Sequence, residues 1–129
     1  MKVIFRENTN EFLTNGKEYL VFEVYINFER QTTTFRLIND KGIPSIFNSN
    51  EFNYEFLKLD DMVYLKRSTS SIITLEKLYL KLNELESIND IWERYFNNDE
   101  SIVRDVNQII VEYAKEQNIY ISSPNPYGF

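Results

Sequence analysis

Closely spaced carboxylates are the residues of this sequence best suited to catalysis or metal binding. They occur at three places, namely Asp60-Asp61, Glu84 with Glu86, and Asp99-Glu100. Adjacent residues of a strand point to opposite faces, and residues two apart do not share a helix face. None of these spacings matches the regular acidic positions of an EF-hand loop. We therefore interpret these carboxylates as surface charge, helix-capping acids or contacts for a partner, in preference to an acid/base pair.

Histidine and cysteine are both absent from the 129 residues. Their absence excludes Ser-His-Asp and Cys-His nucleophiles, and also zinc sites built from these ligands. The three glycines are too dispersed to form a phosphate-binding loop. We expect a protein that is not an enzyme and that needs no cofactor or metal.

The formal net charge of −6 indicates the kind of partner. Nucleic-acid binders normally present a basic face, so the charge disfavours nucleic acid and favours a basic protein. We expect partner contacts from carboxylates in or near turns of the first half, where no helix needs them as caps. These candidates are Asp40, Glu51, Asp60 and Asp61. The rival acidic surface in the second half consists of Glu84, Glu86 and Glu93.

The first half of the chain, residues 1–73, predicts an antiparallel sheet. Strands are expected at 2–6, 18–28, 32–38, 43–47 and 62–68, and a short alternating piece at 52–56. Every second residue of the longest segment is apolar, which predicts one buried face made of Leu20, Phe22, Val24, Ile26 and Phe28.

A tight turn, Asn39-Asp40-Lys41-Gly42, separates two of these strands. Gly42 can take the left-handed conformation that closes a short hairpin loop with a bulge. Pro44 cannot donate a ladder hydrogen bond, which favours an edge strand or a strand start. We therefore expect a hairpin within a compact sheet.

Helices are expected in residues 74–118, where the apolar spacing changes to three and four. The first begins with Thr74 as its N-cap, and the second with Ser87. The single tryptophan, Trp92, shares an apolar stripe with Tyr95, so we interpret it as a core residue and not as a binding anchor. Asp99 caps the clearest helix, 100–117, whose buried stripe is Ile102, Val106, Ile109, Ile110 and Tyr113. The tail, 119–129, ends in six residues that we expect to be loose.

Strands followed by helices indicate one α+β domain, with a small antiparallel SH3-like β-barrel or sheet followed by two or three helices. The N-terminal residues lack the apolar stretch of a secretory signal, and no segment is apolar enough to cross a membrane. We expect a cytoplasmic protein.

Three segments carry a resemblance to a known group of proteins: the LTNGKEY run, FRLINDKGIPSIFNSNEF, and IWERYFNNDESI. They resemble small bacterial proteins with an SH3-like barrel followed by helices, several of which are similar to immunity partners of polymorphic or contact-dependent toxins. The resemblance implies this fold and a role in binding a toxin. We expect the protein to neutralise its cognate toxin by occluding the active site. The acidic charge adds the expectation that this toxin is a basic nuclease. The alternative is an SH3-like interaction or regulatory module with another protein partner.

Overall fold

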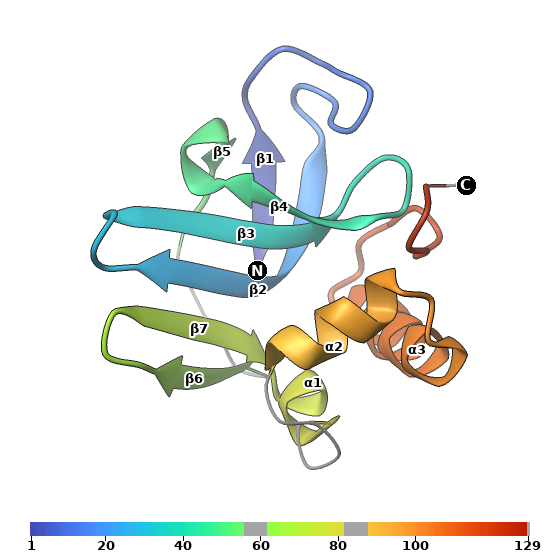
Figure 1. Cartoon of the computed structure of the whole chain (residues 1–129). Coiled ribbons are helices and arrows are strands. Elements are labelled where there is room, and N and C mark those ends of the chain that lie inside the picture. The colour runs from blue at the N-terminus through green and yellow to red at the C-terminus, as the bar shows by residue number, and fades with distance from the viewer. Residues whose placement is uncertain (56–61, 82–87, 129) are drawn as a thin grey trace.

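The computed structural model describes residues 1–55, 62–81 and 88–128, and it is an α+β fold (Figure 1). The strands are β1 (Lys2–Phe5), β2 (Glu18–Asn27), β3 (Thr32–Ile38), β4 (Pro44–Asn48), β5 (Phe52–Asn53), β6 (Met62–Lys66) and β7 (Ser70–Leu75). A 3-10 turn, η1 (Ser49–Glu51), lies between β4 and β5. The helices are α1 (Glu76–Leu80), α2 (Ile88–Phe96) and α3 (Glu100–Glu116). The change from strand to helix falls after Leu75, two residues later than the sequence predicted.

The strands form one antiparallel sheet in which β2 is central. The order is β4-β3-β2-β1-β5, and β7 also pairs with β2 and with β6. One edge of β2 pairs with β3, while its other edge is divided between β1 at residues 18–20 and β7 at residues 23–27. Among the described residues the sheet is open, since β4 and β5 end the strand path. The predicted antiparallel sheet is therefore confirmed, and closure into a barrel is not.

The expectation of a single buried face along β2 is wrong. Residues 19–24 are all buried, and Phe28 is 47% exposed. The reason is a register shift, a β-bulge, between Val21 and Glu23. Leu20 and Phe22 pack in the cluster that contains the helices, whereas Val21 and Val24 pack in the other cluster. The alternation therefore changes phase in the middle of the strand.

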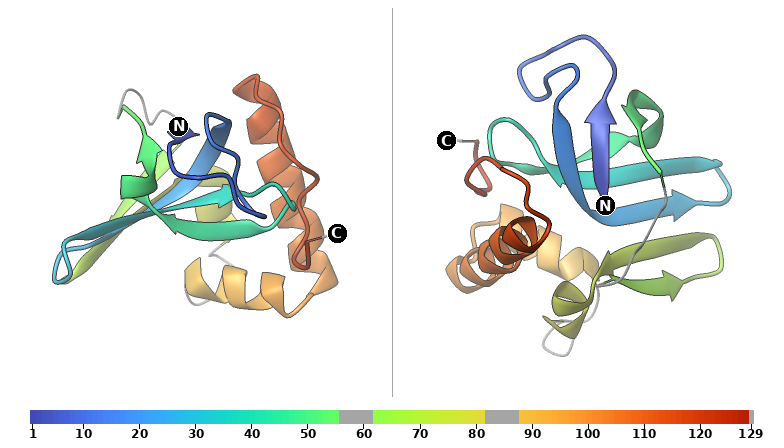
Figure 2. Two further views of the ribbon diagram at one scale, coloured as in Figure 1. Left: turned by 90° about the horizontal axis from the view of Figure 1, so that it is seen from above. Right: turned by 180° about the vertical axis from the view of Figure 1, so that it is seen from behind.

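Two apolar clusters result from this change of phase. One fills the space between the sheet and the helices, and it contains Phe22, Leu78, Trp92 and Ile110 among others. The second lies among the curved strands β1, β2, β3 and β5, where Phe5 and Phe35 each pack against Phe52. Figure 2 shows α2 and α3 gathered on one side of the curved strands. The sheet thus has a core on each face.

The predicted hairpin is confirmed and its loop is short. β3 and β4 pair in register from Thr34 with Asn48 to Ile38 with Pro44. Gly42 has φ of +83°, the left-handed conformation that glycine adopts without steric cost. Pro44 is the first residue of β4, and β4 is an edge strand, as the sequence indicated.

The first two helices differ from the prediction at their starts. Thr74 is not an N-cap, because it lies buried in β7 and donates from Oγ1 toward Glu23 at 3.5 Å. The expected Ser87 cap lies outside the described residues. The core assignment in α2 is confirmed, with Ile91, Trp92 and Tyr95 at most 5% exposed.

α3 is the element that the sequence predicted best. The Asp99 carboxylate accepts from the backbone N–H of Ile102, which satisfies one of the free donors at the helix start. Ile102, Val106, Ile110 and Tyr113 are buried, as predicted. Ile109 is only partly buried, although it packs against the same cluster. None of the helices in the described ranges has the length and apolarity of a membrane span.

The end of the chain is docked, so the expectation of a loose tail is wrong for residues 124–128. Ser122 Oγ donates to the carbonyl of Asp40, and the Asn125 N–H donates to the carbonyl of Gly42 at 2.9 Å. The Asn107 side chain of α3 donates to the carbonyl of Pro124, which is buried. The tail therefore runs between α3 and the β3–β4 loop, beside which it lies in Figure 1.

Replacing Ile110 by Ala should lower the free energy of unfolding by about 2–5 kcal/mol, because a cavity replaces a side chain with no exposed surface. The matched variant Ile109→Ala, one position along the helix, should lose less, since that side chain is already partly in solvent. Urea denaturation of the two variants measures the difference. Equal losses would contradict the assignment of the buried stripe.

Gly42→Ala should destabilise the fold and also release the tail. A Cβ at this position would lie 2.1 Å from the Ser123 carbonyl oxygen, in addition to the cost of a positive φ, which is about 1–2 kcal/mol. Gly16→Ala is the matched control, because Gly16 has φ of +80° and no atom within 4 Å of the added Cβ. Unfolding experiments should show the larger loss for Gly42→Ala. Faster hydrogen exchange at the Asn125 amide should occur in that variant alone, and an unchanged rate would contradict the docking.

Candidate functional site

The structure separates the carboxylates that the sequence nominated as partner contacts. Asp40 lies in the β3–β4 loop and Glu51 in η1, so the length of β4 stands between them. Asp60 and Asp61 lie outside the described residues. The rival residue Glu93 is exposed on α2, whereas Glu84 and Glu86 also lie outside the described residues.

Asp40 is held by its own fold. Thr14 Oγ1 donates to Asp40 Oδ2 at 2.7 Å, and Lys17 Nζ forms an ion pair with Oδ1 at 2.6 Å. The Tyr19 hydroxyl also donates to Oδ1, at 2.9 Å, and the Asp40 N–H donates to the carbonyl of Phe12. Both carboxylate oxygens thus have internal donors. This residue ties the long β1–β2 loop to the β3–β4 hairpin.

These contacts change the acidity of two side chains. Partial burial opposes ionisation of Asp40, but the hydrogen bonds from Lys17, Thr14 and Tyr19 outweigh it and hold its pKa below the usual value. Burial of the phenol raises the pKa of Tyr19 to about 12, and the Asp40 hydrogen bond and charge add to this increase. At neutral pH Asp40 is an anion and Tyr19 a neutral donor.

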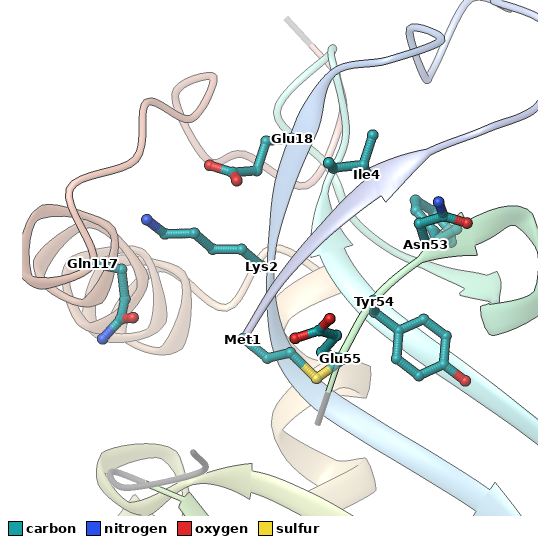
Figure 3. A pocket seen from close by; sticks show the side chains of 9 residues that line it. Met1, Lys2, Ile4, Glu18, Asn53, Tyr54, Glu55 and Gln117 are labelled. Atoms are coloured by element: carbon teal, nitrogen blue, oxygen red, sulfur yellow. The ribbon is translucent and has the colours of Figure 1, made fainter. Parts of the chain in front are cut away.

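A hollow of the described surface lies on the outer face of β1. It is a pocket of about 750 Å³ between β1, the start of β2, the end of β5 and the residue after α3 (Figure 3). Its apolar lining consists of Met1, Ile4, Phe52 and Tyr54. Its polar lining consists of Lys2, Glu18, Asn53, Glu55 and Gln117. The volume is in the range of small-molecule and side-chain binding sites.

Strand pairing explains why these residues share one face. β1 alternates exposed and buried residues, so Lys2 and Ile4 point outward while Val3 and Phe5 enter the core. Ile4 pairs with Glu18 of β2 on one side and with Asn53 of β5 on the other. Cross-strand neighbours on one face stand close enough to interact. Ile4, 38% exposed, therefore forms an apolar floor between two polar walls.

The charges of the pocket are not neutralised by the fold. Glu18, Glu55 and Lys2 are exposed, and none of the three joins an ion pair or a side-chain hydrogen bond among the described residues. Figure 3 shows Lys2 extending toward Gln117 while Glu55 enters from the β5 side. The charged side chains of the lining are thus two carboxylates and one ammonium group, with a net negative charge.

Sequence reasoning missed Glu18 and Glu55. Glu18 was interpreted only as the start of a strand, and Glu55 carried no pattern of its own. The local sequence holds no signal that both line one pocket, because the pairing of β1 with both β2 and β5 brings them to it.

A second polar cluster is buried and structural. The Trp92 indole N–H donates to Glu23 Oε2 at 3.0 Å, and Arg36 Nε lies 3.4 Å from Glu23 Oε1. The Arg36 guanidinium also stacks 4.2 Å above the Trp92 ring and donates to the carbonyl of Pro44. Glu23 is 7% exposed, so a ligand has no access to its carboxylate. In residues 1–55, 62–81 and 88–128 no group of three or more acidic side chains has the geometry of a metal site.

Asp40→Asn should lower the free energy of unfolding by about 1.5–3 kcal/mol at neutral pH, the usual range for hydrogen bonds to a charged group. The folded-state pKa of Asp40 is depressed, so its contribution is present above the unfolded-state value of 3.8 and disappears as pH falls through the lower folded value. Urea denaturation from pH 7 to pH 2 should therefore show the two proteins converging in acid.

The control for this experiment is Glu29→Gln. It removes the same charge from an exposed turn residue for which the described structure contains no side-chain hydrogen bond or ion pair. If the difference in free energy of unfolding between wild type and Asp40→Asn stays constant down to pH 2, the role of the ionised carboxylate is contradicted.

Comparison with known proteins gives no relative for this chain. No protein-family model matches the sequence, and no curated protein or solved structure is significantly similar to it.

Proposed function

We propose that this protein is a cytoplasmic immunity protein that binds a cognate bacterial toxin and occludes its active site. The observation that carries the proposal is the β1 pocket, where Glu18 and Glu55 flank an exposed apolar floor without internal ion pairs in the described structure. A basic surface complements such a rim, and the net charge of −6 acts in the same direction over the whole molecule. The resemblance of the hairpin and helix segments to immunity partners of toxins adds to this support.

Neutralisation by occlusion requires surface complementarity and no chemistry from the inhibitor. A nuclease toxin must hold phosphates with cationic side chains, so its active site is the surface that an acidic inhibitor fits best. Long-range attraction accelerates the encounter, and contacts between desolvated groups slow dissociation. The toxin that we propose is therefore a basic nuclease.

We also propose that the first five strands form an opened SH3-like arrangement. In its support, the two ends of the five-strand path, β4 and β5, approach one another, since the ring of Phe52 in β5 lies against Phe47 of β4 as well as Phe35 of β3. The 3-10 turn η1 brings the chain directly from β4 to β5. An interaction module with a different protein partner would use the same arrangement, and the experiment below separates the two functions.

The toxin to test is the product of the open reading frame directly upstream of the gene. Producing that toxin in a bacterial host should arrest growth, and producing this chain with it should restore growth. The two proteins should purify as a complex. The absence of both a complex and protection would contradict the proposal, and a complex with a non-toxic neighbour would favour the interaction module.

Electrostatic steering should be visible in the association rate. Raising the salt concentration from 0.1 M to 1 M shortens the Debye length from about 10 Å to about 3 Å and should slow association. Glu51→Gln should slow it in 0.1 M salt, while Glu93→Gln on α2 is the control for the rival surface. If the association rate changes neither with salt nor in the two variants, the acidic charge serves only solubility.

A further inference from the structure

We infer that the β1 pocket receives a basic side chain, lysine or arginine, from an extended segment of the partner. This inference rests on the proposed function, because it names the chemistry by which the partner is held. A basic side chain combines an aliphatic stem with a cationic end. The pocket offers the matching surfaces, an apolar floor at Ile4, which is 38% exposed, and a rim with Glu18 and Glu55.

The geometry of the pocket favours a side chain that enters along β1. Glu18 stands beside Ile4 through the β1–β2 pairing, and Glu55 follows Asn53, which stands beside Ile4 on the other side. A stem that lies on Ile4 therefore has its cationic end in the hollow that both carboxylates line. The volume of about 750 Å³ also leaves room for the backbone that carries the side chain.

The charge of the pocket selects against other occupants. An anion would meet two carboxylates, and a purely apolar side chain would leave both of them desolvated without a counter-ion. Lys2, whose side chain extends toward Gln117 in Figure 3, is the one basic side chain among the lining residues. Its ammonium group belongs to the same pocket as the two carboxylates, so we expect Lys2 to compete with the incoming cation for them.

The test is a titration of the ¹⁵N-labelled full chain with capped pentapeptides. Their central residue is arginine, lysine or citrulline, and glycine fills the other positions. Citrulline has nearly the shape of arginine without its charge. The arginine and lysine peptides should give saturable shifts of the amides of Lys2, Ile4, Asn53 and Glu55, with a dissociation constant on the order of 1 mM. The citrulline peptide should give none.

Four variants then assign the charges. Glu18→Gln and Glu55→Gln should each weaken binding about two- to fivefold, the range measured for solvent-accessible ion pairs. Lys2→Gln should tighten binding by a similar factor. Glu29→Gln is the control for the change in net charge and should leave binding unchanged. All four residues are exposed, so their replacement leaves the core intact, and the amide spectrum of each variant verifies this directly.

Several results would overturn the inference. They are equal binding of the citrulline peptide, shifts that do not saturate or that map away from β1, and an equal loss of affinity in Glu29→Gln. A chain that protects cells from the toxin but does not bind the basic peptides would overturn this inference and leave the proposed function standing. A chain that binds the peptides through the pocket but protects no cell would contradict the proposed function alone.

Discussion

The buried carboxylate of Glu23 is the interaction on which the packing of helices against the sheet depends. A charge with 7% exposure is stable only when it is paired and hydrogen-bonded. Its partners come from three different elements, Arg36 of β3, Thr74 of β7 and Trp92 of α2. Arg36 extends the network to β4 through the Pro44 carbonyl. Among the described residues no buried side-chain N or O atom lacks a partner, so the network is complete and fixes α2 in one position on the sheet.

The β-bulge in β2 makes this arrangement possible. Without it, Phe22 and Glu23 would point to opposite faces, but the shift between Val21 and Glu23 lets both contact Trp92. The same strand gives one edge to two partners, first β1 and then β7. As a result β1 stands beside the end of α3 rather than beneath the helices, and its outward residues remain uncovered. The pocket on β1 therefore results from the pairing of one edge of β2 with two different strands.

Features with a local physical cause were predictable from the sequence. The hairpin follows from the positive φ that Gly42 permits, and α3 follows from a capping aspartate and a long apolar stripe. Features that depend on distant pairing were not predictable. The alternation of apolar residues along β2 predicts a strand, but it does not show where the buried face changes from one side to the other. The bulge was therefore not predicted. The docking of Ser122 on Asp40 joins residues 82 positions apart, and no pattern in the tail indicates it. The pocket was missed because three strands and the residue after α3 assemble it.

The carboxylates also illustrate how a fold decides which charges are available to a partner. Asp40 lies in a turn, where the sequence favoured it as a contact, but Thr14, Lys17 and Tyr19 already supply the donors that a partner would bring. A competing cation would have to displace Lys17 at 2.6 Å and would gain little. Glu18 begins β2 and Glu55 lies two residues after the end of β5, where the described structure supplies no such donors. A charge that the fold leaves without a counter-ion keeps its full interaction energy for an incoming partner, so the strand ends of β2 and β5 are better placed for recognition than the turn.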